Sequence, residues 1–248
     1  MKTLVIGDIH GYYRELTDAL ANASYEEGDQ LIFLGDYIDG GPQGRQVIEY
    51  LESLKNKKNV FLRGNHEELF LRAVQGDTSA YDVLMYNGFT STLKSYGVDP
   101  QRLSYSHGRH YINRNGDQIH LNGVELMRFL KGVFPAEHLR FIERTGYYFQ
   151  TDSTFFSHAG AEPCRPLHEQ SGTDFTTGSD RFFLKQRYNY GKTLVFGHFH
   201  LMDPLVGKRK ICLGMEHGVR ILLLNHDVTA IVDSDGEYRE VSDEWFTA

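Results

Sequence analysis

The sequence predicts an α/β fold, and three observations support this prediction. Short apolar runs that are typical of buried strands alternate with amphipathic helical patterns over the first 64 residues. Strand patterns return after about residue 150, and the last three follow one another closely. Between these regions, two stretches have apolar residues at helical spacing, and the remainder is mixed and rich in turn residues. The length of 248 residues fits one large α/β domain or two small ones.

The first part of the chain is predicted to form two βαβ units. Strands are expected at residues 3–7, 30–35 and 59–64, and helices are expected at residues 11–23 and 44–56. Both helical stretches place their apolar residues on one face. This alternation predicts parallel strands joined by right-handed helical crossovers.

Residues 67 to about 150 are predicted to form a mainly helical insertion beside a cleft. Helical patterns are present at residues 67–74 and 123–133, whereas the remainder is mixed and rich in turn residues. Tyr, Phe and Leu are too frequent here for a disordered linker. We therefore expect a packed insertion rather than a connecting segment.

The last part of the chain returns to strands. Strand patterns occur at residues 154–160 and 192–198. Three more follow as close neighbours, at residues 210–214, 219–225 and 228–234. Because so little chain separates these three, we expect them to form an antiparallel second sheet.

Composition argues against several classes of protein. No apolar run approaches the ~20 residues that a membrane-spanning helix needs, and the N-terminus has no signal-peptide pattern, so we expect a cytoplasmic protein without a membrane segment. Cys164 and Cys212 lie far apart without C-x-x-C spacing, which argues against a disulfide scaffold or a thiolate zinc site. The formal charge of −7 argues against stable nucleic-acid binding.

Polar residues gather at the ends of five predicted strands. They occur in the stretches GDIHG, GDYIDGG, RGNHE, SHAG and GHFH. In parallel α/β sheets, the ligand crevice lies beyond the carboxyl ends of the strands, so we expect these side chains to meet at one edge. A glycine next to or within each stretch lets the backbone turn tightly there.

The side chains in these stretches predict a metal centre. Carboxylate, amide and imidazole ligands suit manganese, iron or zinc better than calcium. They are too many for one tetrahedral ion but match two divalent ions that share a carboxylate. Such a pair lowers the pKa of a bridging water, which supplies hydroxide near neutral pH. We therefore predict two divalent ions, with manganese the first choice, and hydrolysis of a phosphate ester.

The motifs GDIHG, GDYIDGG, LRGNHEE, SHAG and VFGHFH occur in this order between residues 7 and 200. In this respect the chain resembles the calcineurin-like metallophosphoesterases. It is most similar to the phosphoprotein-phosphatase branch, which contains bacterial and phage Ser/Thr protein phosphatases and diadenosine tetraphosphate hydrolases. The resemblance implies a single domain over residues 1–248, built as a four-layer sandwich of two mixed β-sheets flanked by helices, with a binuclear metal centre at the sheet edge.

The resemblance also implies a set of metal ligands. The first metal would be held by Asp8 and His10. The second would be held by Asn65, His158 and His198. The carboxylate of Asp36 would bridge both metals. The family branch usually reads G-H-T-P where this chain reads G-H-F-H. The second histidine, His200, matches the wider G-H-x-H pattern, and we expect it to bind the first metal directly. The alternative is that His200 faces the substrate or only supports a ligand.

Four further residues have implied roles in catalysis and substrate binding. His66 corresponds to the general acid that protonates the leaving group, and Asp39 corresponds to the carboxylate that orients its imidazole. Arg63 corresponds to an arginine that grips phosphate oxygens. Arg181 resembles a second phosphate-binding arginine, with Arg187 as the alternative.

One departure from the family pattern concerns the phosphate-binding arginines. The family usually has arginine where this chain has Gly40, and Arg45 is the nearest residue that would compensate.

Two catalytic functions and one binding function fit these observations. The first is a metal-dependent phosphatase that acts on phosphomonoesters, including phosphoserine, phosphothreonine or phosphotyrosine of proteins. The alternative is a dinucleoside polyphosphate hydrolase, which would cleave diadenosine tetraphosphate. The expected partner is thus a phosphorylated small molecule, a nucleotide or a phosphoprotein. A non-catalytic metal-binding scaffold fits less well, because it would not need His66 and Asp39.

Overall fold

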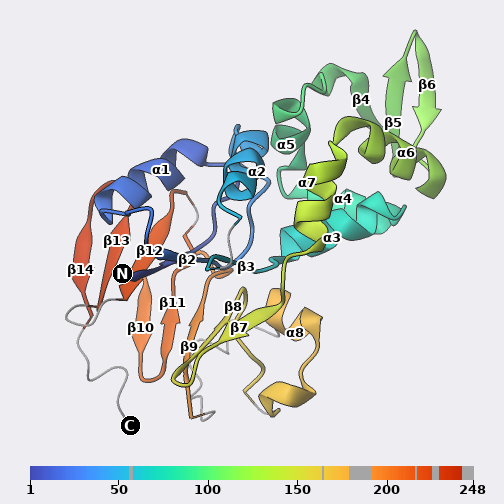
Figure 1. The fold of residues 1–248 in the computed structure, drawn as a ribbon. Helices are drawn as coiled ribbons and strands as arrows, with labels where there is room; N and C mark the ends of the chain where they lie inside the picture. The colour runs from blue at the N-terminus through green and yellow to red at the C-terminus, as the bar shows by residue number, and fades with distance from the viewer. Residues whose placement is uncertain (56–57, 164, 179–190, 216, 225–228, 242–248) are drawn as a thin grey trace.

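A computed structural model gives the fold of the chain (Figure 1). The structure describes residues 1–55, 58–163, 165–178, 191–215, 217–224 and 229–241. Within these residues, no helix is both long and apolar enough to cross a lipid bilayer.

The first sheet is mixed, and its order in the described residues is β14-β13-β12-β1-β2-β3. Its strands are β1 Thr3–Ile6, β2 Gln30–Phe33, β3 Val60–Phe61, β12 Arg220–Leu224, β13 Thr229–Asp233 and β14 Tyr238–Glu240. The strands β1, β2 and β3 are parallel, as the βαβ pattern predicts. On its other side, β1 pairs with β12 in the antiparallel direction.

The second sheet is also mixed, with the order β10-β11-β9-β8-β7 among the described residues. Its strands are β7 Tyr148–Gln150, β8 Thr154–Ser157, β9 Thr193–Phe196, β10 Leu205–Gly207 and β11 Lys210–Cys212. The central strands β8, β9 and β11 are parallel, and the two edge strands are antiparallel to their neighbours.

The two sheets pack face to face, with helices on the outside (Figure 1). Side chains alternate along β1, so Leu4 and Ile6 pack in the same cluster as residues of helices α1 (Tyr13–Asn22) and α2 (Gly44–Ser53), whereas Val5 packs against residues of the second sheet. On the outer face of the second sheet, Phe155 contacts Phe175 of α8 (Gly172–Thr176). The predicted α/β sandwich is therefore confirmed.

The 65–143 segment projects from the sandwich (Figure 1). Its helices are α3 Asn65–Val74, α4 Thr78–Tyr86, α5 Phe89–Ser95, α6 Gly123–Val133 and α7 Ala136–Glu143. Short 3₁₀ helices occur here at Pro100–Arg102 and, beyond this segment, at Leu167–Glu169. The segment also contains a small antiparallel sheet that the sequence analysis did not predict, with strands β4 Leu103–Ser106, β5 Arg109–Arg114 and β6 Asp117–His120. Asn115 and Gly116 between β5 and β6 both have positive φ, which is a known signal for a tight hairpin.

The prediction that residues 210–234 form one antiparallel sheet is wrong. The strand β11 belongs to the second sheet and runs parallel to β9, whereas β12 and β13 extend the first sheet. The chain thus passes from one sheet to the other between Cys212 and Arg220. Strands that are equally apolar can be buried in either sheet, so closeness in sequence did not determine their partners.

Candidate metal centre and catalytic pair

The loops after β1, β2, β3, β8 and β9 bring the polar stretches together. Within the described residues, three groups of side chains have ligand atoms that all lie within 4.8 Å of one another. The groups are Asp8 with His10 and His200, His10 with Asp36 and His66, and Asp36 with His158 and His198. Since neighbouring groups share His10 or Asp36, the three groups form one continuous site.

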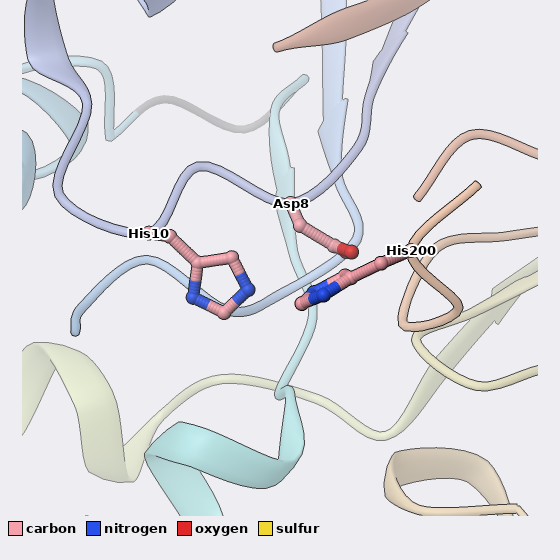
Figure 2. A group of neighbouring side chains, drawn as sticks. All are labelled: Asp8, His10 and His200. Carbon is pink, nitrogen blue, oxygen red and sulfur yellow. The ribbon is translucent and has the colours of Figure 1, made fainter. Parts of the chain in front are cut away.

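Figure 2 shows the first group, whose side chains extend toward one another from loops of both sheets. Asp8 and His10 come from the loop after β1, and His200 comes from the loop after β9. The rings of His10 and His200 are 5.5 Å apart between centroids and nearly perpendicular. Asp8 and His10 are buried, whereas His200 is exposed, so the group opens to solvent on the side of His200. A ligand role for His200 stays a prediction.

The third group, Asp36 with His158 and His198, lies beside Asn65, which begins helix α3. The Oδ1 atom of Asn65 lies 2.9 Å from Nε2 of His158 and 2.9 Å from Nδ1 of His198. Asp36 lies between His158 and His10, because its Oδ2 atom is 3.2 Å from Nε2 of His158 and 3.6 Å from Nε2 of His10. This central position fits a carboxylate that is shared by two metal ions.

Unsatisfied polar atoms show that these residues fit a metal ion. In the described part of the chain, Oδ2 of Asp8 and Nε2 of His10 are buried without a hydrogen-bond partner. Leaving such atoms unpaired costs about 1–3 kcal/mol each. A cation bound among them would remove that cost, and carboxylate, imidazole and amide ligands suit manganese, iron or zinc.

The pKa shifts of three candidate ligands, His10, His198 and Asp36, also fit metal binding. Burial lowers the pKa of His10, and burial together with the neighbouring His158 lowers the pKa of His198 to about 3. Both imidazoles are therefore neutral at pH 7 and can donate a lone pair to a metal. Burial acts to raise the pKa of Asp36, but His158 and His66 outweigh it and hold this pKa well below its usual range. Asp36 is therefore an ionised carboxylate.

The backbone of the site adopts conformations that are uncommon for residues other than glycine. Four site residues have left-handed φ values, namely His10 at 46°, Asp36 at 51°, Asp39 at 74° and His198 at 63°. Hydrogen bonds hold the first of these turns, because the backbone N–H groups of Ile9 and His10 both donate to the carbonyl oxygen of Asp36. Such strained conformations gather at functional sites.

Two glycines allow the loops to approach the carboxylates. A Cβ atom at Gly64 would lie 2.1 Å from Oδ1 of Asp36, and a Cβ atom at Gly197 would lie 2.2 Å from Oδ1 of Asp8. Both distances are far below van der Waals contact, so any side chain at these positions would displace the carboxylate beside it.

His66 and Asp39 form a buried pair beside the candidate ligands. The Nδ1 atom of His66 lies 2.6 Å from Oδ2 of Asp39, and its ring centroid is 4.8 Å from that of His10. Burial acts to lower the pKa of His66, but Asp36 and the hydrogen bond to Asp39 outweigh it and raise this pKa to about 10. His66 is therefore protonated at neutral pH and has a proton to donate.

Two further residues, Glu67 and Thr92, support this site, although no role was predicted for either from the sequence. The buried carboxylate of Glu67 accepts hydrogen bonds from the backbone N–H groups of Asp36 at 2.8 Å, Tyr37 at 2.8 Å and Gly64 at 3.0 Å. The stretch RGNHE gave a signal for this role, because Glu67 occupies the third position of α3 in a capping box. Thr92 of α5 contacts Asp39, and no sequence pattern links these two distant residues.

The guanidinium group of Arg63 has several partners. It donates to Oγ1 of Thr145 at 3.1 Å, to Glu68 at 3.1 Å and to the carbonyl oxygen of Glu143 at 2.9 Å, and it lies 4.9 Å from the ring of Tyr147. Through these contacts, Arg63 links the loop after β3 to the end of α7. A phosphate contact of Arg63 stays a prediction, and its formation would have to compete with these hydrogen bonds.

Of the three other candidate arginines, the structure describes only Arg45. Arg181 and its alternative Arg187 lie outside the described residues. Arg45 is exposed on α2 and pairs with Glu49 at 2.8 Å. A side chain at Gly40 would begin 3.5 Å from the carbonyl oxygen of His10 and 4.0 Å from the ring of Tyr12. The family arginine would thus begin beside His10, and here the ring of Tyr12 borders that position.

The sandwich presents a cluster of carboxylates and imidazoles that could hold metal ions. A family model described as calcineurin-like phosphoesterase matches residues 1–202, and the chain belongs to this family.

Two similar proteins are named as bis(5'-nucleosyl)-tetraphosphatases, one asymmetrical and one symmetrical. The asymmetrical bis(5'-nucleosyl)-tetraphosphatase PrpE of Oceanobacillus iheyensis is 26% identical over 220 residues, which cover 83% of this chain and 80% of that protein. The symmetrical bis(5'-nucleosyl)-tetraphosphatase of Edwardsiella ictaluri is 40% identical over 80 residues, but the match covers only 32% of this chain and 28% of that protein.

A solved structure supports the fold. The cold-active protein-tyrosine phosphatase of a psychrophilic Shewanella species has a TM-score of 0.59 at 14% identity, with 97% of this chain and 80% of that chain covered. At this identity, the likeness shows the fold alone.

Proposed function

We propose that the chain hydrolyses phosphomonoesters with the help of two divalent metal ions. The observation that supports this proposal is the buried Asp39–His66 pair beside the candidate ligands. A protein does not need this pair to hold metal. A positioned proton donor matters most when the leaving group is poor, as the alkoxide of a phosphomonoester is.

Under this proposal, separate residues would bind the metal ions and donate the proton. Asp8, His10 and His200 would hold one ion, Asn65, His158 and His198 would hold the other, and Asp36 would contact both. When bound, the two ions would polarise the phosphate oxygens and lower the pKa of an attacking water. Asp39 would hold Nδ1 of His66, which leaves Nε2 to donate a proton to the departing oxygen.

The second candidate is hydrolysis of a dinucleoside tetraphosphate, and the names of the relatives favour it. The bond cleaved would then be a phosphoanhydride, whose leaving group is a phosphate and needs less protonation than an alkoxide. This candidate uses the same metal ligands and depends less on His66.

A direct comparison of substrates tests both candidates. The protein is stripped with a chelator and reloaded with manganese, and kcat/KM is measured for p-nitrophenyl phosphate, a phosphoserine peptide and diadenosine tetraphosphate. We expect hydrolysis only after metal is restored, with the phosphate monoesters preferred. A strong preference for diadenosine tetraphosphate would favour the second candidate instead. Full activity of the stripped protein would reject both.

Replacing His200 with alanine tests the first metal position. We expect His200→Ala to retain about one tightly bound manganese ion per chain rather than two, because the first group would keep only Asp8, His10 and the shared Asp36. Metal content after gel filtration gives this number. His168→Ala is the matched control, since His168 is an exposed histidine that belongs to none of the candidate ligand groups. Two ions bound by His200→Ala with unchanged affinity would show that His200 is not a ligand.

A further inference from the structure

Thr92 makes two hydrogen bonds to the residue that orients His66. Thr92 lies in helix α5 of the 65–143 segment and is fully buried. Its hydroxyl group donates to Oδ1 of Asp39 at 2.8 Å and accepts from the backbone N–H of Asp39 at 2.9 Å. The second carboxylate oxygen of Asp39 lies 2.6 Å from Nδ1 of His66. Hydroxyl, carboxylate and imidazole therefore form a continuous hydrogen-bonded chain.

We propose that Thr92 is a positioning residue that sets the orientation of His66 through Asp39. This inference rests on the proposed function of His66 as the proton donor. With Oδ1 held by Thr92 and Oδ2 held by His66, the carboxylate of Asp39 cannot rotate without breaking a hydrogen bond. The imidazole is consequently fixed in the plane that directs Nε2 at the departing oxygen.

The backbone around Thr92 supports this role. Helix α5 begins after Gly88, whose carbonyl oxygen accepts a hydrogen bond from Gly40 at 3.5 Å. A Cβ atom at Gly88 would lie 2.9 Å from the backbone nitrogen of Gly40, so the two chains are in close contact. The 65–143 segment therefore rests directly on the loop that carries Asp39.

Two substitutions separate the hydroxyl group from the shape of the side chain. Thr92→Val removes the hydroxyl group at nearly constant volume, and Thr92→Ser keeps it. We expect Thr92→Val to lower kcat for alkyl phosphates about tenfold and kcat for p-nitrophenyl phosphate much less, because a misaligned acid harms poor leaving groups most. Thr92→Ser should behave like the unmodified protein, and both variants should bind two manganese ions. Thr92→Ala with a thermal melt replaces Thr92→Val if the latter does not fold.

A double-mutant cycle tests whether Thr92 acts through His66. In the His66→Asn background, Thr92→Val should cause no further loss, because the group that it positions is already absent. Equal losses in both backgrounds and on all substrates would overturn the proposal and indicate a packing role alone. If His66→Asn slows alkyl phosphates but Thr92→Val does not, only this inference fails. If His66→Asn has no effect, the proposed function fails, and this inference fails with it.

Discussion

Asp36→Asn is expected to lower turnover by about 10³-fold or more and to deplete both metal positions. Asp36 lies between His10 and His158, and its pKa is held low. Asparagine keeps the shape and the oxygen that accepts from the backbone N–H of His66, but it removes the negative charge that offsets two cations. A loss of about 4 kcal/mol of electrostatic stabilisation corresponds to this factor. Metal analysis and steady-state kinetics on one sample measure both effects.

A buried aspartate elsewhere provides the control for Asp36→Asn. Asp29 is buried and accepts hydrogen bonds from the backbone N–H groups of Lys2 and Glu26, far from the site. Asp29→Asn should lower stability but leave two bound ions and normal turnover. If Asp36→Asn itself kept both ions and near-normal turnover, Asp36 would not be the shared ligand.

His66→Asn is expected to lower the hydrolysis of alkyl phosphates by about 10²–10⁴-fold while both metal ions stay bound. The asparagine amide can still reach Asp39 but has no proton to release at neutral pH. Because p-nitrophenolate leaves readily without protonation, p-nitrophenyl phosphate should lose much less activity. The dependence of kcat/KM on the pKa of the leaving group gives the measurement.

His138 supplies the matched control for His66→Asn. It is buried, and its Nδ1 atom lies 2.8 Å from the hydroxyl group of Tyr96, away from the candidate ligands. His138→Asn should change stability without changing the dependence on the leaving group. If His66→Asn lost the same fraction of activity on aryl phosphates as on alkyl phosphates, the role of His66 as the proton donor would be contradicted.

Local patterns predicted the parts of the fold that depend on neighbouring residues. The spacing of apolar residues marked helices α1, α2, α3 and α6, and the polar stretches after the strands marked the residues that the structure brings together at the sheet edge. Both signals work because side-chain periodicity and strand direction are local properties. Even His200, which departs from the closest family pattern, lies beside Asp8 and His10.

Contacts between residues that are far apart in the sequence could not be predicted from these local patterns. The sheet that receives β12 is decided by its pairing with β1, about two hundred residues earlier in the chain. Thr92 has no motif, because its role arises only when α5 packs on the loop of Asp39. The contacts of Arg63 with Thr145 and Tyr147 likewise join residues that are far apart in sequence. Tertiary packing, rather than any sequence signal, sets all three.

The position of β1 between β2 and β12 has a consequence for synthesis of the chain on the ribosome. At 5–20 residues per second, roughly 10–40 s separate the appearance of β1 from that of β12. During this interval one edge of β1 lacks its final partner, although Leu4, Val5 and Ile6 are all apolar. An unpaired apolar edge promotes aggregation, so the nascent chain is most exposed to this hazard before β12 emerges. Because His198 and His200 also emerge late, the chain can bring all the candidate ligands together only near the end of this interval.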